Sequence, residues 1–446
     1  MLGGTPAASL IGWRRSERVC PNSLRGTRQR EFSRIHDEEY LMPEAVIVAT
    51  ARTPIGRAFK GSLVNCRPDD LSAIAIEAAL AQVPEFDRNE VEDLLMGCGQ
   101  PAGEAGNNIA RNVAILAGMP DVPGVTVNRY CSSSLQTIRM AAHAIRAGEG
   151  DVFIAAGVET VSRFQFGMAD SGPHNTLFTD AEARTAQRAE GGQGTWTPGA
   201  GLPDVYIAMG QTAENVAEAE GVTREEMDEF AALSQQRASA SLERGFWEME
   251  ITPVHTTDAE GNAVTVTTDD GIRPGTTVEG LAKLGPAFRP DGRVTAGNAC
   301  PLNDGAAAVI VMSDTRAAQL GLTPLARIVS SGVSGLNPEI MGMGPVEASR
   351  QALQRAGMSI NDIDLVEINE AFAAQVLPSA RHLGVSIDKL NVNGGAIAVG
   401  HPFGMTGARI MTTLIHGLTE ADKTFGLETM CVGGGQGMAM IVERLS

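Results

Sequence analysis

The chain has 446 residues, 43% of them hydrophobic and 20% charged, a composition typical of a globular protein with room for two or three buried cores. The formal net charge of −18 argues against general binding to nucleic acids or membrane surfaces, and Gly, Asp or Arg interrupts every apolar stretch before it reaches the length of a membrane span. We therefore expect no nucleic-acid or membrane partner, and an anionic substrate would need a local basic group.

The first 41 residues differ from the rest of the chain. They contain seven arginines and five acidic residues, are rich in Gly, Ser and Pro, and lack the apolar region of a secretory signal. Two interpretations remain: an Arg-rich organellar presequence, or an extension upstream of a true start at Met42. We favour the second because the run AVIVATA begins just after MPE. We expect residues 1–41 to be disordered and to carry no chemistry.

Beyond Met42 the hydrophobic pattern alternates between strands and helices. Apolar runs without period-two alternation predict strands that are buried on both faces, as in a sheet covered by helices. Longer amphipathic stretches between them predict the helices. In chain order we expect strands over 45–50, 92–98, 124–128 and 151–157, and helices over 71–83 and directly after Cys131.

The centre of the chain, residues 161–290, has a different composition. It is rich in Gly, Thr, Asp and Pro and contains one strong helical stretch, 223–242, which opens with a Thr-x-x-Glu capping box. Long loops inside a compact domain usually carry function. We therefore expect residues 161–290 to form an inserted loop domain.

After residue 290 the α/β pattern resumes and repeats the order of the first half. In both halves a strand that ends in Val-Asn leads through a turn of small polar residues into a helix. Here we expect helices over 345–357 and 404–418, and strands over 362–369, 389–393 and 437–445. The repetition predicts two duplicated α/β halves, residues 42–160 with 291–314 and residues 315–446, with the functional site where the halves meet.

The six cysteines are far apart, without a Cys-x-x-Cys pair, and no two histidines have metal-ligand spacing. This pattern favours reduced thiols over a disulfide framework, so we expect no metal site and a cytoplasmic location. A mitochondrial location is the alternative if residues 1–41 are a transit peptide. The cysteines are Cys20, Cys66, Cys98, Cys131, Cys300 and Cys431.

Cys131 lies where the strand over 124–128 ends and a helix begins. Unpaired backbone N–H groups and the positive end of the helix dipole would both stabilise a thiolate at this position. The alternative is a buried core residue, since cysteine often packs as a small hydrophobe. The local sequence leaves both interpretations open.

Three segments of the C-terminal third carry polar groups of catalytic types. EINEAFAAQ ends a strand on Asn369, GGAIAVGHPFGMTG surrounds His401 with small residues before a helix, and CVGGGQG places Cys431 before a glycine run that exposes backbone N–H groups. Singly, each is also consistent with a turn residue, a loop histidine or a sharp corner. The glycine run fails the G-x-G-x-x-G pattern, because Met438 follows it and a strand comes next, which argues against an NAD-binding enzyme.

Together these segments resemble the thiolase family. Four blocks, NRYCSSSLQ, EINEAFA, GGAIAVGHPFGMTGAR and CVGGGQGMA, occur in the family's order, with 32 residues from Asn369 to His401 and 30 more to Cys431. ATARTPIGRAFKGSL and VTAGNACPLNDGAAAV also follow the family, so the resemblance covers residues 43–446. It implies the thiolase fold: two duplicated α/β halves, each with a five-stranded mixed sheet and shared helical layers, plus a loop domain that binds coenzyme A.

The resemblance also implies a reaction, the CoA-dependent cleavage of a 3-ketoacyl-CoA to acetyl-CoA and a shortened acyl-CoA, or the reverse Claisen condensation. Cys131 would attack the 3-keto carbon and carry the acyl group, and His401 would be the base for its thiol and later for that of CoA. Cys431 would be the acid or base at the acetyl-CoA carbon. His401 and a water held by Asn369 would bind the enolate oxygen. The backbone N–H groups of Cys131 and Gly433 would bind the tetrahedral oxyanion.

For coenzyme A, a co-substrate rather than a permanently bound cofactor, the resemblance implies further residues. Arg273 would lie near the adenine nucleotide and supply the local positive charge. Two positions depart from the family: Ser134 stands where Gly is usual, and Cys300 stands where many members have a CoA-contacting Ser. The pantetheine channel would be lined by Leu284, Ala287, Phe288, Ala371 and Phe372. The loop domain diverges from that of the short-chain members, so chain length stays open, and we expect a homodimer or homotetramer.

Two other functions are consistent with parts of the pattern. A ketoacyl-carrier-protein synthase has a related fold, but that family typically uses a Cys with two His, and the NEAF segment and Cys431 argue against it. A lipid carrier without turnover would be favoured if a catalytic residue were replaced, and Cys131, His401 and Cys431 are all present. We therefore predict a catalytic thiolase.

Overall fold

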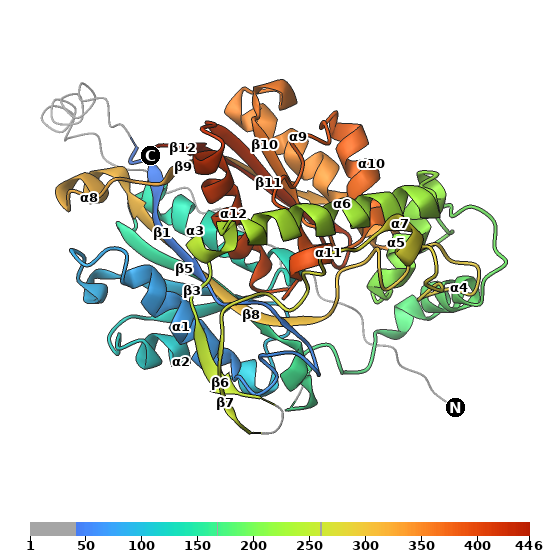
Figure 1. Ribbon diagram of the computed structural model, residues 1–446, viewed down its shortest axis with the longest axis horizontal. Helices are drawn as coiled ribbons and strands as arrows, with labels where there is room; N and C mark the ends of the chain where they lie inside the picture. Colours follow the sequence, from blue (N-terminus) through green and yellow to red (C-terminus); the bar gives the residue numbers. More distant parts are fainter. Residues whose placement is uncertain (1–41, 167, 259–260) are drawn as a thin grey trace, which may run out of the picture. The chain divides into compact units, whose positions relative to one another are not determined.

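A large sheet of buried strands is the framework of the protein, and the computed structural model describes residues 42–446 apart from residues 167 and 259–260 (Figure 1). Residues 1–41, which we expect to be disordered, lie outside the described residues. None of the helices in the described part of the chain is long and apolar enough to cross a membrane.

Within the described chain ten strands form one sheet, in the order β10-β11-β12-β9-β1-β8-β5-β3-β4 with the short β2 paired to β8, and β6 and β7 form a separate hairpin. The strands are β1 (Ala45–Arg52), β2 (Gly56–Arg57), β3 (Asp93–Cys98), β4 (Gly124–Val127), β5 (Val152–Thr160), β6 (Val254–Thr257), β7 (Ala263–Val266), β8 (Asn303–Ser313), β9 (Ala326–Gly335), β10 (Leu365–Ile368), β11 (Phe425–Val432) and β12 (Gln436–Arg444). The helices are α1 (Pro68–Leu80), α2 (Ile109–Leu116), α3 (Ser133–Ala147), α4 (Thr179–Ala189), α5 (Met209–Ala219), α6 (Arg224–Glu243), α7 (Val278–Leu281), α8 (Asp314–Gln319), α9 (Gly344–Ala356), α10 (Ala373–Leu383), α11 (Ala396–Val399) and α12 (Thr406–Glu420).

The sheet consists of two parts with the same strand order and direction. In the first part β3 is parallel to β4 and β5, and β8 is antiparallel to β5 and β1. In the second part β10 is parallel to β11, and β12 is antiparallel to β11 and β9. The parts are joined where β1 and β9 share two residue pairs, Val46–Arg327 and Ile47–Ala326. This repeat confirms the predicted duplication of an α/β half.

Helices cover both parts of the sheet and also lie between them. α1 and α2 pack on one face of the first part, α9 and α10 pack on one face of the second, and α5 and α6 pack against α10. α3 and α12 occupy the space between the two parts, where buried side chains from both, such as Ile47 and Met440, surround them (Figure 1). The predicted shared helical layer is therefore present, and it contains the helices that follow Cys131 and His401.

One predicted strand, residues 389–393, is wrong. Leu390 forms a single bridge to Val366, and the chain then turns because Asn391 adopts a left-handed conformation with φ 45°. The Asn391 side chain accepts from the N–H of Ile368 and donates to its carbonyl, both at 2.9 Å. A side-chain amide thus takes the place of a strand neighbour, and the second part of the sheet has four strands in the described chain rather than the expected five.

The other differences concern elements that the hydrophobic pattern does not predict. β9 has the sequence ARIVSSGVSG, whose Ser and Gly residues are typical of a loop, and β11 contains the fully buried Glu428. In contrast, α6 begins with the predicted capping box, in which Thr223 and Glu226 exchange hydrogen bonds. The segment 161–290 contains α4 to α7 and the β6–β7 hairpin, and its boundaries as a loop domain stay a prediction.

Candidate active site

The candidate nucleophile and base each stand just before a helix of the central layer. Cys131 lies in the 3-10 turn Tyr130–Ser132 that leads into α3, and His401 lies in the loop that leads into α12. Tyr130 has a φ of 44°, a left-handed conformation that costs about 1–3 kcal/mol in a residue other than glycine. Such strain is concentrated at functional sites, where the surrounding structure holds it in place.

The first turns of α3 and α12 are in direct contact. A Cβ atom on Gly407 would lie 2.2 Å from the backbone nitrogen of Leu135, so only glycine allows the helices to approach this closely. The hydroxyl of Ser134 accepts a hydrogen bond from the backbone N–H of Ala408 at 2.9 Å. Ser134, which departs from the family pattern, therefore fastens the two helices together and does not line the acyl cavity.

A cavity of about 420 Å³ includes Cys131 in its wall, and its volume lies in the range of small-molecule sites, about 300–1,000 Å³. Both halves and the inserted segment 161–290 contribute to this wall. Cys131, Phe403 and Gly433 come from the halves, whereas Asp170, Tyr206 and Met209 come from the segment 161–290.

Cys131 itself is only 9% exposed. Burial raises the pKa of its thiol to about 12, although the backbone N–H groups of Gly433 and of Cys131 favour the thiolate. In the unliganded protein desolvation thus outweighs the stabilisation of the thiolate by the nearby amides. At neutral pH the side chain is a thiol, and its reaction requires a base.

His401 is buried and forms a short chain of hydrogen bonds. Its Nδ1 lies 2.6 Å from the hydroxyl of Thr406, which donates its own proton to the carbonyl of Pro402 at 2.7 Å. Since that hydroxyl proton is already used, the pattern assigns the imidazole proton to Nδ1 and leaves the lone pair on Nε2. Burial and the positive charge of Arg409 lower the pKa of His401 to about 3. The side chain is therefore a neutral imidazole with its basic nitrogen at Nε2.

Asn369 and Cys431 come from neighbouring strands of the second part of the sheet. Asn369 follows β10, and its amide nitrogen lies 3.3 Å from Nε2 of His401. Cys431, on β11, is completely buried, and burial together with the nearby thiols of Cys131 and Cys300 raises its pKa well above the ordinary value. The structure thus places Asn369 beside His401, and Cys431 near Cys131 and Cys300.

A second cavity, of about 360 Å³, has among its lining residues four that the sequence assigned to coenzyme A: Arg273, Ala287, Phe288 and Cys300. The other three assigned residues do not line it. Phe372 packs behind Phe288, with the ring centroids 6.1 Å apart, and the carbonyl of Ala371 accepts the N–H of Cys300 at 3.0 Å. Leu284 is 39% exposed outside the cavity.

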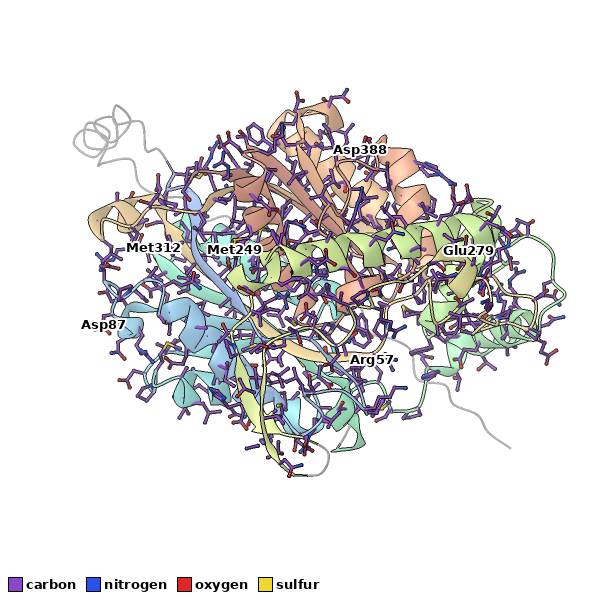
Figure 2. All side chains as sticks on the ribbon, viewed as in Figure 1. Arg57, Asp87, Met249, Glu279, Met312 and Asp388 are labelled. Carbon is purple, nitrogen blue, oxygen red and sulfur yellow. The ribbon has the colours of Figure 1, made fainter. Side chains whose placement is uncertain are left out.

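Two basic residues that sequence reasoning missed also line the second cavity, Arg57 and Lys60. The positive charge of Arg57, labelled in Figure 2, lowers the pKa of Arg273 after the larger effect of burial, so the two guanidinium groups are close enough to repel one another. Both missed residues belong to the segment ATARTPIGRAFKGSL, which matches the family. That match could have indicated a functional role for them. The cavity therefore concentrates positive charge in a chain whose net charge is −18.

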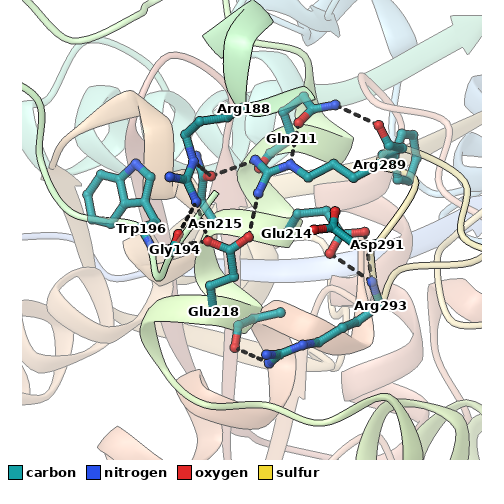
Figure 3. Close-up of polar contacts among 12 residues, drawn as sticks. Arg188, Gly194, Trp196, Gln211, Glu214, Asn215, Glu218, Arg289, Asp291 and Arg293 are labelled. Carbon is teal, nitrogen blue, oxygen red and sulfur yellow. Dashed lines mark hydrogen bonds and ion pairs between the residues drawn. The ribbon is translucent and has the colours of Figure 1, made fainter. Parts of the chain in front are cut away.

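The start of helix α5 lies beside both cavities. Met209, at its start, lines the first cavity, and Phe288 of the second lies so close that a Cβ atom on Gly210 would be 2.2 Å from its ring. The next residue, Arg289, is nearly buried and donates to Glu218 and to two further side chains of α5, each at 2.7 Å (Figure 3). This network fixes the segment after Phe288 against α5.

Comparison with known proteins identifies the family. The model of the thiolase N-terminal domain matches residues 45–315, and that of the thiolase C-terminal domain matches residues 322–444. The chain belongs to the thiolase family. This thiolase is 44% identical over 411 residues to the 3-ketoacyl-CoA thiolase of Bacillus subtilis, which covers 90% of this chain and 100% of that protein.

Two further similarities bear on its activity and fold. This thiolase is also 44% identical over 409 residues to a β-ketoadipyl-CoA thiolase of Acinetobacter baylyi, covering 91% of this chain and 100% of that protein. The crystal structure of human mitochondrial 3-ketoacyl-CoA thiolase, 38% identical, superposes with a TM-score of 0.78 over 91% of this chain and 100% of that one. The thiolase fold that the sequence implies is thus confirmed.

Proposed function

We propose that this thiolase cleaves a 3-ketoacyl-CoA with the thiol of CoA, yielding acetyl-CoA and a shortened acyl-CoA, or runs the reverse condensation, with the acyl group carried on Cys131. The observation that carries the proposal is a buried thiol at a cavity wall, beside the N–H of Gly433 and at the junction where a neutral His401 presents Nε2. A nucleophile with a nearby base and an amide donor is the arrangement that acyl transfer requires.

In the first half-reaction His401 takes the proton of the Cys131 thiol at Nε2, and the sulfur attacks the 3-keto carbon. The bond between the α and β carbons then breaks, so that the acyl group stays on sulfur and the electron pair leaves as the enolate of acetyl-CoA. Cys431 protonates the enolate carbon. Asn369 has a buried side-chain oxygen without a partner among the described residues, which suits it to hold a water at the enolate oxygen.

Before the second half-reaction the proton on His401 passes to the Cys431 thiolate, which restores both groups. His401 then takes the thiol proton of CoA, and the CoA sulfur attacks the thioester carbon on Cys131. The backbone N–H groups of Cys131 and Gly433 bind the oxyanion of the tetrahedral intermediate, and collapse releases acyl-CoA. Loss of one such donor typically lowers the rate about a hundred- to a thousandfold. The collapse leaves Cys131 as a thiolate, which takes the proton back from His401, and the cycle closes without a permanently bound cofactor.

Coenzyme A occupies the second cavity in this proposal. Arg273, Arg57 and Lys60 would receive its phosphate groups, while Ala287 and Phe288 contact the apolar part of pantetheine. Cys300 stands in the same wall, where its weakly polar thiol is a poorer hydrogen-bond partner than a hydroxyl.

The cavity at Cys131 favours an uncharged acyl chain. Its wall contains the carboxylate of Asp170, bound by the Gln100 side chain at 2.7 Å, and no Lys or Arg among the described residues. His174 also lines it, but its Nδ1 pairs with Glu182 at 3.1 Å, so the pair supplies no net positive charge. An acyl chain that ends in a carboxylate would be buried against Asp170 without a counterion.

Two assays test this function. With CoA and purified protein, 3-ketohexanoyl-CoA should be cleaved with a kcat/KM at least about tenfold above that of 3-ketoadipyl-CoA, which has the same chain length and a terminal carboxylate. After incubation with acetyl-CoA, mass spectrometry should show an added acetyl group on the Cys131 peptide, and the Cys131→Ala variant should be inactive. A label on another residue, or a faster reaction with the dicarboxylic substrate, would contradict the corresponding part of the proposal.

The setting of the reaction follows from the same residues. The five cysteines in the described chain are free thiols. Because oxidation of Cys131 or Cys431 would stop turnover, we infer a reducing compartment such as the cytoplasm. We further infer a homodimer or homotetramer, which light scattering of the purified protein measures directly.

A further inference from the structure

Glu159, next to the last residue of β5, is a buried carboxylate outside the set of catalytic residues. It is 1% exposed and accepts three backbone hydrogen bonds, from Gly99 at 2.8 Å, Gln100 at 3.1 Å and Gly404 at 2.9 Å. A carboxylate with several amide donors is a strong local anchor, since hydrogen bonds to a charged acceptor are roughly twice as strong as neutral ones.

The three amides belong to two different walls of the catalytic cavity. Gly404 lies in the loop that carries His401, directly after the lining residue Phe403. Gln100 is itself a lining residue, and its side-chain oxygen accepts the backbone N–H of Ala169 at 2.9 Å, next to Asp170. One carboxylate therefore connects the base-bearing loop to the wall that faces the acyl chain.

The His401 loop and the end of β5 are in close backbone contact beside Glu159. A Cβ atom on Gly404 would lie 2.2 Å from the carbonyl oxygen of Val158, and one on Gly157 would lie 2.0 Å from the carbonyl oxygen of Gly404. The loop thus rests backbone to backbone on the end of β5, where neither glycine has a side chain that could interlock with its neighbour. The hydrogen bond from Gly404 to Glu159 holds the loop here, three residues beyond the point where the N–H of His401 donates to Asn303 at 2.9 Å.

We propose that Glu159 is a positioning residue for thiolysis, holding the His401 loop against the Cys131 cavity through the amide of Gly404 while it orders the opposite wall through Gln100. This inference rests on the proposed function. The carboxylate reaches no substrate atom in this role and acts only through the loop. Burial raises the pKa of Glu159 to about 7, because desolvation of the charged form outweighs its stabilisation by the three amide donors.

The test compares Glu159→Gln and Glu159→Ala with the wild type in the thiolysis assay. In Glu159→Gln one accepting oxygen remains, but an NH₂ donor then lies against at least one of the backbone N–H groups. Glu159→Ala removes both accepting oxygens. We expect kcat of the folded protein to fall about tenfold for Gln and about a hundredfold for Ala, since small misplacements of catalytic groups have effects of this size. The KM for CoA should stay within about twofold, because the CoA cavity is formed by other segments.

Asp364→Asn is the matched control. Asp364 also accepts two backbone N–H groups, from Thr424 at 3.0 Å and Phe425 at 2.9 Å, but at the end of β10 opposite Asn369. The control should lower the melting temperature without changing kcat. If the Glu159 variants melt earlier yet keep the wild-type kcat, Glu159 is merely structural and the proposal is overturned. Should Glu159→Ala fail to fold, Glu159→Gln decides alone.

Acetylation of Cys131 in the wild type separates the two proposals. A wild type that is not acetylated by acetyl-CoA contradicts the proposed function itself. If the wild type is acetylated and the Glu159→Gln variant has the same acetylation rate and the same kcat, only the positioning role is contradicted. Slower acetylation of Cys131 in folded Glu159→Gln, with normal acetylation in Asp364→Asn, supports it.

Discussion

The hydroxyl of Ser134 accepts the backbone N–H of Ala408 at 2.9 Å and so joins the first turn of α3 to the first turn of α12. The N–H groups of a first helical turn have no partner inside their own helix. Here the missing acceptor of α12 comes from a different helix, and the same bond fixes the distance between the segments that carry Cys131 and His401.

Replacing Ser134 by Ala should therefore destabilise the fold. The variant leaves a buried N–H of α12 without its acceptor, and we expect the free energy of unfolding to fall by about 1–3 kcal/mol. Urea denaturation measures the change. Ser349→Ala is the control, because the Ser349 hydroxyl is buried but has no hydrogen-bond partner in the described chain. Equal losses in the two variants would show that the link between the helices contributes nothing.

The pKa of Cys131 predicts how its reactivity depends on pH. Burial raises this pKa to about 12, so in the resting protein the thiolate fraction should grow about tenfold for each pH unit between about pH 7 and about pH 9. The rate of iodoacetamide labelling at Cys131, followed on its peptide by mass spectrometry, should rise accordingly, with Cys131→Ala as the blank. A rate that is already constant above pH 7 would reveal a stable thiolate–imidazolium pair instead.

A buried ion pair connects β1 to the segment 161–290. Arg52 donates to Glu250 at 2.7 Å and to Asp269 at 2.8 Å, and all three side chains are fully buried. Arg52→Met should cost about 3–5 kcal/mol of unfolding free energy, because it leaves two carboxylates without their partner. The exposed pair of Arg67 with Asp69 provides the comparison: Arg67→Met should cost about 0–1 kcal/mol. Similar losses of unfolding free energy in Arg52→Met and Arg67→Met would contradict the prediction that the buried Arg52 contacts contribute more than the exposed pair.

The basic residues of the second cavity should govern the affinity for CoA. Arg273→Met and Arg57→Met should each raise the KM for CoA about fivefold, the effect of roughly 1 kcal/mol, with kcat nearly unchanged. Added salt should raise the wild-type KM more than that of either variant, because it screens the charges that the variants lack. Arg350→Met, on the exposed side of α9, serves as the control. A fall in kcat without a change in KM would place these residues elsewhere in the mechanism.

The sequence predicted the site residues that lie in local patterns, but not the properties that depend on burial or on contacts between distant segments. Cys131, Asn369 and His401 each follow a strand or precede a helix, so local patterns together with the family blocks indicated all three. Residue spacing could not show that desolvation would leave Cys131 a thiol, because burial is a property of the whole fold. Glu159 gave no signal either, since its role depends on three backbone amides from distant parts of the chain.

The errors in the strand pattern have a similar origin. The segment 389–393 has the composition of a strand, yet the side chain of Asn391 satisfies the backbone of Ile368 and ends the pairing after one bridge. The hydrophobic pattern did not predict β11 because this strand contains Glu428. The pattern assigns a carboxylate to solvent, but Glu428 is fully buried. In both cases a polar side chain inside the protein overrides a pattern that equates polarity with the surface.

The neutral state of Cys131 and His401 has a consequence for selectivity. A thiol whose pKa is raised to about 12 reacts slowly with simple electrophiles at neutral pH, because the thiolate is the reactive form. Reactivity appears only when a ligand places an electrophilic carbon beside the sulfur and lets the proton move to Nε2. An inhibitor that mimics the 3-keto thioester would itself bring about the proton transfer from Cys131 to His401. A generic thiol reagent would react only with the small fraction of Cys131 that is already a thiolate.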